Sequence, residues 1–221
     1  SARVTVQIEP PKANEDRVKF RLDVVGPNGE SLPELRVGDP FYLVLYVQDV
    51  RPSGAGVATA YLDVSFAAES VTATGPVEHG PAYSTQTSGQ VTAGQIDEAG
   101  GRTDSLSLGA DEHLLFQVPF KARLRGSVTF TVDPADEAEH IVELEGVPEP
   151  IPPLRWTVDP LTVAISSFQN ESQAEDVDDD GWITPLDALL VINDLNNRGA
   201  RDLTDTDERP EHLIDVNGDD Y

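Results

Sequence analysis

Alternation of apolar and polar side chains most limits what this 221-residue chain can fold into. Four apolar residues, Val18, Phe20, Leu22 and Val24, alternate with charged neighbours. A β-strand points successive side chains to opposite faces, so such a run has one buried and one solvated face. The same alternation recurs over residues 3–8. The run 41–47 is apolar throughout, which is typical of a strand covered on both sides.

Turn residues separate a series of further strand candidates. These candidates are residues 57–66, 70–74, 113–120, 127–132, 140–144 and 154–165. The turn residues are Gly26–Gly29, Gly38–Pro40, Pro52–Gly56 and Gly100–Gly101. Residues 75–112 are rich in Gly, Ser, Thr and acids, and they predict long loops with short strands. The pattern therefore predicts a mainly β chain, with an antiparallel β-sandwich over residues 1–165.

The composition excludes several classes of function. The chain has 15 Lys and Arg against 40 Asp and Glu, a net charge of −25, which argues against binding to nucleic acid or to an anionic membrane surface. It has no Cys, so disulfides and thiolate metal sites are excluded. No run approaches the roughly 18 apolar residues of a membrane span. The N-terminus lacks the pattern of a signal peptide, so we expect either a cytosolic protein or a processed mature chain.

The acidic residues are concentrated near the C-terminus. Residues 1–165 hold 12 basic and 24 acidic residues, a net charge of −12, whereas residues 166–221 hold 3 and 16, a net charge of −13. So dense a set of carboxylates suggests a positive ligand, and a divalent cation is the first candidate.

The predicted sandwich offers little catalytic chemistry. Its three histidines, His79, His113 and His140, stand far apart in the sequence, and we interpret them as structural. The acidic clusters 97–98 and 136–139 are interpreted as solvated loops. No nucleophile elbow or cofactor fingerprint is present, so we predict no catalytic residues and no enzymatic activity.

Residues 176–187 have the spacing of a calcium-binding loop. Gly181 occupies the sixth position, which needs a sharp turn, and Ile183 the apolar eighth position. Calcium prefers about 6–8 oxygen ligands, and the loop supplies such a set. The predicted ligands are Asp176, Asp178, Asp180, Trp182 through its carbonyl, Thr184 through a water, and Asp187. We predict one well-formed Ca²⁺ site here.

A helix is expected directly after this loop, from Pro185 to about Asn197. Thr184 is the expected N-cap, and Pro185 suits the first helical turn. The apolar residues of this helix form the predicted partner face. They are Leu186, Leu189, Leu190, Ile192 and Leu195.

A second loop begins at residue 215 and is incomplete. Asp215, Asn217, Asp219 and Tyr221 repeat positions 1, 3, 5 and 7, with Asp220 in place of Gly at the sixth. With four or five ligands at most, this second Ca²⁺ site is expected to be partial and weak.

A calcium loop followed by one helix, then by a second loop, resembles the dockerin module, here of type I and truncated. The run from Asp176 to Asn193 carries this resemblance. The upstream part is similar to the dockerin's partner, the cohesin domain, in the stretches 37–41, 57–66, 115–122 and 126–130. The resemblance implies a jelly-roll β-sandwich over residues 1–165 and a small C-terminal EF-hand-like segment with one helix over residues 166–221. It also implies that calcium orders the helix and that the protein is extracellular or at the cell surface.

The sequence departs from the dockerin pattern where dockerins meet their partners. Positions 10 and 11 of the first loop are Pro185 and Leu186 instead of Ser-Thr, and Ile192-Asn193 replaces a basic pair. Partner recognition is therefore expected to be more apolar.

Several partners remain open at this stage. The helix would dock on this chain's own sandwich or on the sandwich of another copy or another protein, and head-to-tail contacts between copies would build filaments or rings. The main alternative is a carbohydrate-binding sandwich that recognises a cell-surface glycan.

Overall fold

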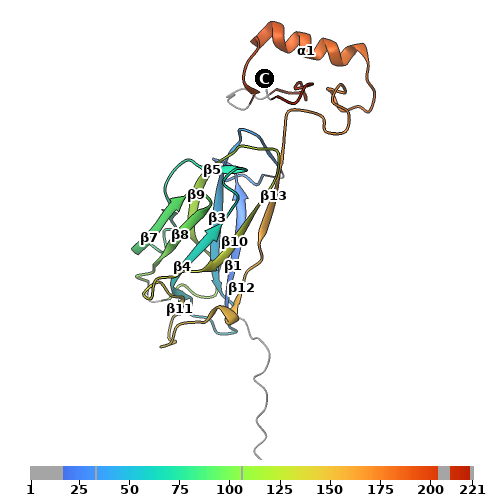
Figure 1. The fold of residues 1–221 in the computed structure, drawn as a ribbon. Helices are drawn as coiled ribbons and strands as arrows, with labels where there is room; N and C mark the ends of the chain where they lie inside the picture. Colours follow the sequence, from blue (N-terminus) through green and yellow to red (C-terminus); the bar gives the residue numbers. More distant parts are fainter. Residues whose placement is uncertain (1–16, 33, 106, 204–209, 220–221) are drawn as a thin grey trace, which may run out of the picture.

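The alternating runs pair into two β-sheets that pack face to face (Figure 1). The computed structural model describes residues 17–32, 34–105, 107–203 and 210–219, so the predicted strand at residues 3–8 lies outside the described residues. In hydrogen-bonded order, the first sheet contains β12 (Trp156–Thr157), β1 (Val18–Val25), β3 (Pro40–Asp49), β9 (His113–Ala122) and β5 (Val71–Ala73), and β6 (Glu78–His79) also pairs with β9. The second contains β2 (Leu35–Arg36), β13 (Leu161–Ser166), β10 (Gly126–Pro134), β4 (Val57–Ser65), β8 (Gln95–Arg102) and β7 (Thr85–Thr92), and β11 (Glu143–Leu144) pairs with β4. The predicted mainly β sandwich is confirmed.

The core lies between the two sheets and is rich in phenylalanine. Phe120 of β9 packs against Phe41, Phe66 and Phe130, with ring centroids 5.6, 5.0 and 5.7 Å away. On β3 the inward residues are fully buried, whereas Tyr42 and Tyr46 on the outer face are half-buried. The expectation that residues 41–47 are covered on both sides is therefore right only in part.

Residues 75–112 are more regular than the sequence suggested. The strands β7 and β8 each have eight residues and pair antiparallel, so the prediction of long loops with short strands is wrong there. Gly100–Gly101 is also not a turn, because both residues lie inside β8. A Cβ atom at Gly100 would stand 1.9 Å from the carbonyl oxygen of Ala60, so close strand approach explains this glycine.

Two other strand predictions were too long. Of residues 140–144, only β11 at Glu143–Leu144 is a strand. Residues 154–165 divide into a 3₁₀ turn, η1 (Pro153–Arg155), the short β12, and β13.

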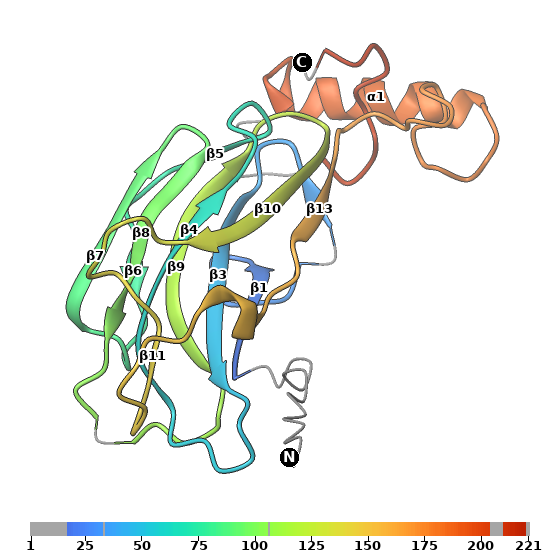
Figure 2. The same cartoon turned by 60° about the horizontal axis from the view of Figure 1, so that its bottom comes forward.

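The chain leaves the sandwich at the end of β13 and forms the C-terminal segment, of which residues 167–203 and 210–219 are described. This segment lies across one end of the sandwich (Figure 2). Its helix, α1 (Pro185–Arg198), lies on the side of the segment that faces away from the sheets (Figure 1). Phe168 is 2% exposed at the junction, and its carbonyl accepts a hydrogen bond from the Asp215 N–H at 3.1 Å.

Candidate functional site

The acidic loop 176–187 is held in shape by hydrogen bonds from its own backbone to Asp176. This carboxylate is 1% exposed and accepts from the N–H groups of Asp180 at 3.1 Å and Gly181 at 2.8 Å. The chain can turn back in this way because Asp179 and Gly181 have positive φ angles of 56° and 87°. Gly181 thus performs the turn that the sequence assigned to it.

Asp187 closes the loop from the helix end. Its Oδ1 atom accepts from Val177 N–H at 2.8 Å, and its Oδ2 atom accepts from Thr184 N–H at 2.7 Å. The hydrogen bond from Thr184 N–H, aided by those from Val177 and Asp178, holds the pKa of Asp187 below its usual value against the opposing effect of burial. The residue is 2% exposed and is therefore a buried anion at neutral pH.

Asp178 carries the clearest sign of a cation-binding site. Its Oδ1 atom is buried and has no hydrogen-bond partner among the described residues. Burial raises the pKa of Asp178, and the nearby carboxylates of Asp180, Asp187 and Asp176 raise it further. Oxygen atoms of Asp176, Asp178 and Asp187 lie within 4.8 Å of one another, so these residues fit a hard divalent ion such as Ca²⁺.

Three other predicted ligands have different settings. Asp180 is exposed, lies outside this close group, and accepts from Trp182 N–H at 2.8 Å. The Thr184 hydroxyl accepts from Leu186 N–H at 3.1 Å, which confirms Thr184 as the N-cap of α1 in a capping box with Asp187. The Trp182 side chain is 73% exposed. That Trp182 binds through its carbonyl and Thr184 through a water stays a prediction.

Asn170 is a site residue that the sequence reasoning missed. It is 5% exposed, and its amide nitrogen donates to the Asp176 carbonyl at 2.9 Å and to Asp179 Oδ1 at 3.0 Å. Asparagine lies outside the loop pattern, so the spacing of the acids gave no signal for it.

The second half-loop has a similar local turn. Asp215 is 1% exposed, and its Oδ1 atom accepts from Gly218 N–H at 2.8 Å and Asp219 N–H at 3.2 Å. Asn217 Nδ2 donates to Asp219 Oδ2 at 2.8 Å. The predicted ligand Tyr221 lies outside the described residues. The proposal of a second, partial Ca²⁺ site therefore rests on Asp215, Asn217 and Asp219.

Helix α1 presents most of its apolar side chains to solvent. Its covered stripe contains Asp187, Leu190, Val191 and Asp194, which are buried or half-buried. The remaining apolar residues of the predicted partner face are about half exposed, namely Leu186 at 49%, Leu189 at 49%, Ile192 at 51% and Leu195 at 48%. Leu190 is thus the one predicted partner residue that lies on the covered stripe.

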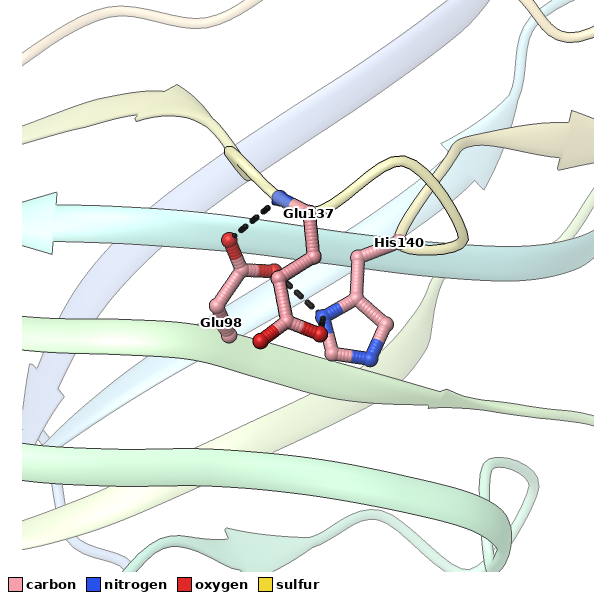
Figure 3. A group of neighbouring side chains, drawn as sticks. All are labelled: Glu98, Glu137 and His140. Carbon is pink, nitrogen blue, oxygen red and sulfur yellow. Dashed lines mark hydrogen bonds and ion pairs between the residues drawn. The ribbon is translucent and has the colours of Figure 1, made fainter.

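A cluster on the sandwich corrects the interpretation of the acids at residues 97–98 and 136–139. Glu98 is 7% exposed and accepts hydrogen bonds from the N–H groups of Asp136 and Glu137 and from the His140 ring (Figure 3). It is not a solvated loop residue, because the loop between β10 and β11 folds over it. The sequence pattern could not show this contact between residues some 40 positions apart.

The aromatic side chains do not favour the glycan-binding alternative. Trp156 packs edge-on against Phe20, with centroids 5.3 Å apart, and Tyr83 is fully buried. On the outer face of β3, the Arg21 guanidinium lies 4.3 Å from the ring centre of Tyr46.

Comparisons with known proteins agree with this geometry. Residues 174–220 match the family model described as dockerin type I domain. A search of curated proteins finds no match.

Solved cohesin structures resemble the sandwich. A chain of a type I cohesin–dockerin complex from Clostridium thermocellum covers 72% of this chain and 99% of its own length, with 12% identity and a TM-score of 0.50. The seventh ScaB type I cohesin of Pseudobacteroides cellulosolvens covers 68% of this chain and 93% of its own, with 11% identity and a TM-score of 0.46. A non-cellulosomal cohesin from Archaeoglobus fulgidus covers 68% and 86%, with 16% identity and a TM-score of 0.40. The chain therefore joins a β-sandwich with the cohesin fold to a segment that matches the dockerin type I model.

Proposed function

We propose that this protein is a non-catalytic, calcium-dependent assembly module, in which the C-terminal segment docks on a cohesin-like sandwich. The observation that carries the proposal is the match of residues 174–220 to the dockerin type I model, in a segment whose helix exposes its apolar face. We divide the chain into a cohesin-like domain at residues 1–165 and a dockerin-like domain at residues 166–221.

Calcium would act by neutralising carboxylates that are buried next to one another. Asp176, Asp178 and Asp187 would hold the ion at the first site, with Asp180, the Trp182 carbonyl and a water on Thr184 completing its shell. When bound, the ion supplies positive charge to Asp178 Oδ1, the buried oxygen without a hydrogen-bond partner in the described part of the chain, and removes the repulsion among these carboxylates. Because Asp187 also closes the capping box of α1, order in the loop and order in the helix are coupled.

The docking surface would be the exposed row Leu186, Leu189, Ile192 and Leu195 on α1. Exposed apolar patches of this kind mark contact sites in soluble proteins. The helix faces away from the sandwich of its own chain, so this structure favours a partner in trans over docking in cis (Figure 1). That partner is the sandwich of another copy or of another protein. Copies joined head to tail would form open filaments or closed rings.

The place of action would be outside the cell or on its surface, as expected for cohesin and dockerin modules. The one α-helix of the described residues falls short of the length and apolar character needed to cross a bilayer.

Light scattering on the intact chain tests the proposal, in excess Ca²⁺ and in excess chelator. A second arm measures binding of the chain to an immobilised type I cohesin, again with and without Ca²⁺. We expect calcium-dependent growth in mass or calcium-dependent binding to the cohesin. Absence of both would overturn the assembly proposal.

A substitution pair assigns the effect to the helix. Leu189→Asp should abolish the calcium-dependent contact, whereas Leu154→Asp, at a residue 84% exposed in η1, should leave it unchanged. Equal loss in both variants would contradict docking through α1.

A further inference from the structure

Glu98, Glu137 and His140 form a second cluster of metal-ligand type, on the sandwich and separate from the acidic loop. One ligand atom from each residue lies within 4.8 Å of the others. Figure 3 shows the three side chains pointing toward one another, Glu98 from β8 and the other two from the loop between β10 and β11. The cluster thus combines one imidazole with two carboxylates.

The backbone fixes the direction of Glu98. Its φ angle is +52°, an unusual value for a residue other than glycine, and it lies at an irregularity where β4 and β8 shift register between Leu62 and Val64. Asp63 Oδ1 accepts the Glu98 N–H at 2.8 Å. Bulges of this kind aim a side chain away from the regular pleat, and here the side chain is directed at the loop.

Hydrogen bonds orient the two oxygens of Glu98 differently. Oε1 accepts from the Asp136 and Glu137 N–H groups, the latter at 2.8 Å, so Oε2 is left directed at His140 Nδ1. Burial raises the pKa of Glu98, but these N–H groups and His140 outweigh that effect and hold the pKa below its usual value. Glu98 is therefore a buried carboxylate with one preoriented oxygen.

The imidazole is positioned as firmly as the carboxylate. Its ring stacks on Tyr61, with centroids 4.2 Å apart and planes 20° apart. Nδ1 also lies 3.6 Å from Glu137 Oε2, and that side chain is 68% exposed, which leaves a path to solvent. Such surrounding contacts are what orient the ligands of a protein metal site.

We propose that Glu98, Glu137 and His140 bind a transition-metal ion of the Zn²⁺ class. The ion would displace the proton that Nδ1 shares with Glu98 Oε2 to solvent, and the ring and the carboxylate would move apart to admit it. The two carboxylates would balance its charge of +2. Three protein ligands with an open fourth position are a common zinc arrangement. Imidazole favours Zn²⁺, Ni²⁺ or Cu²⁺ over Ca²⁺, so this site would not compete for the ion of the acidic loop.

Zinc titration of the intact chain by calorimetry tests this proposal, with excess Ca²⁺ present to occupy the acidic loop. We expect one Zn²⁺ per chain and a higher thermal midpoint for the sandwich with Zn²⁺ bound. His140→Phe keeps a ring against Tyr61 and removes the ligand nitrogen, and it should weaken Zn²⁺ binding by more than about tenfold. Glu137→Gln, at an exposed position that should not affect folding, should also weaken it.

Two matched variants serve as controls. His113→Phe and Glu139→Gln change the same residue types outside the cluster and should leave Zn²⁺ affinity unchanged. Replacing Zn²⁺ by Co²⁺ should give a visible absorption band that is lost in His140→Phe. Failure of the chain to bind Zn²⁺, or wild-type Zn²⁺ affinity in both His140→Phe and Glu137→Gln, would overturn the proposal and leave the Glu98–His140 contact as a hydrogen bond that fixes the loop.

Discussion

The side-chain amide of Asn170 donates to the main-chain carbonyl of Asp176 across 2.9 Å, and so joins the exit from β13 to the first residue of the acidic loop. The same nitrogen lies 3.0 Å from Asp179 Oδ1, while the Asn170 Oδ1 atom accepts from Ser172 N–H at 3.0 Å. One buried side chain therefore fixes both the start of the loop and the turn that leads to it.

Asn170→Ala should weaken calcium binding without destabilising the sandwich. The substitution leaves the predicted ligands in place but frees Asp176 and Asp179, and loss of a supporting contact around a metal site typically costs about 10–100-fold in affinity. Calorimetric titration with Ca²⁺ measures the change. Glu171→Gln, at the exposed neighbouring position, is the control, and equal affinity in Asn170→Ala and the wild type would contradict this role.

Phe168→Ala should release the C-terminal segment from the sandwich. The ring is 2% exposed, and the guanidinium carbon of Arg36 lies 6.0 Å from its centre. Removing a buried Phe side chain costs about 3–5 kcal/mol, and here the cost falls on the junction. We expect faster proteolytic cleavage between residues 166 and 176 in this variant. The control variant Leu154→Ala should be cleaved at the wild-type rate. Cleavage at the wild-type rate would show that the junction does not depend on this ring.

Periodicity and spacing predicted those parts of the molecule that depend on local rules. Thr184 could be assigned as the N-cap of α1 because capping needs a short polar side chain directly before the helix. The strand β1 followed from its alternation, which the burial pattern repeats. By contrast, β7 and β8 have Gly and Ser where a strand pattern expects apolar residues, and β8 is a strand through its pairing with β4 and β7.

The unpredicted site residues depend on contacts between distant segments. Asn170 bonds to the acidic loop from outside the motif, and Glu98 meets His140 only because the loop after β10 folds over β8. Neither contact leaves a periodic signal in the sequence. A register shift, such as the one that turns Glu98 outward, likewise becomes visible only when the partner strand is known.

Gly100→Ala should destabilise the sandwich far more than Gly109→Ala. A Cβ atom at residue 100 would lie 1.9 Å from the Ala60 carbonyl oxygen, so β4 and β8 must separate, at a cost of about 3 kcal/mol. Gly109 has a φ angle of +74° and open space around it. Alanine there therefore costs only the strain of a left-handed backbone, about 1 kcal/mol. Urea unfolding followed by circular dichroism compares the two variants. Similar losses of stability in the two variants would mean that β4 and β8 can move apart at little cost.

Asp49 should contribute stability that is lost in acid. The carboxylate is 1% exposed and bonds to Arg51 Nη2 at 2.6 Å and Gly56 N–H at 3.1 Å. Burial alone raises the pKa of Asp49, but Arg51 and the main-chain N–H groups of Arg51 and Gly56 bring it below its usual value. The unfolded chain therefore takes up the proton first, so the stabilisation is complete above the ordinary aspartate pKa of about 4 and falls as the pH drops toward the lower folded pKa.

Asp49→Asn should accordingly make the free energy of unfolding less dependent on pH below about pH 4. The variant loses the charged acceptor and should be roughly 2 kcal/mol less stable at neutral pH, with the difference from wild type shrinking below about pH 4. Urea midpoints measured from pH 7 to pH 3 give both quantities. Asp23→Asn, whose side chain is 48% exposed, should follow the wild-type profile more closely. A constant difference between Asp49→Asn and wild type across this range would show that the Asp49 charge is not linked to folding.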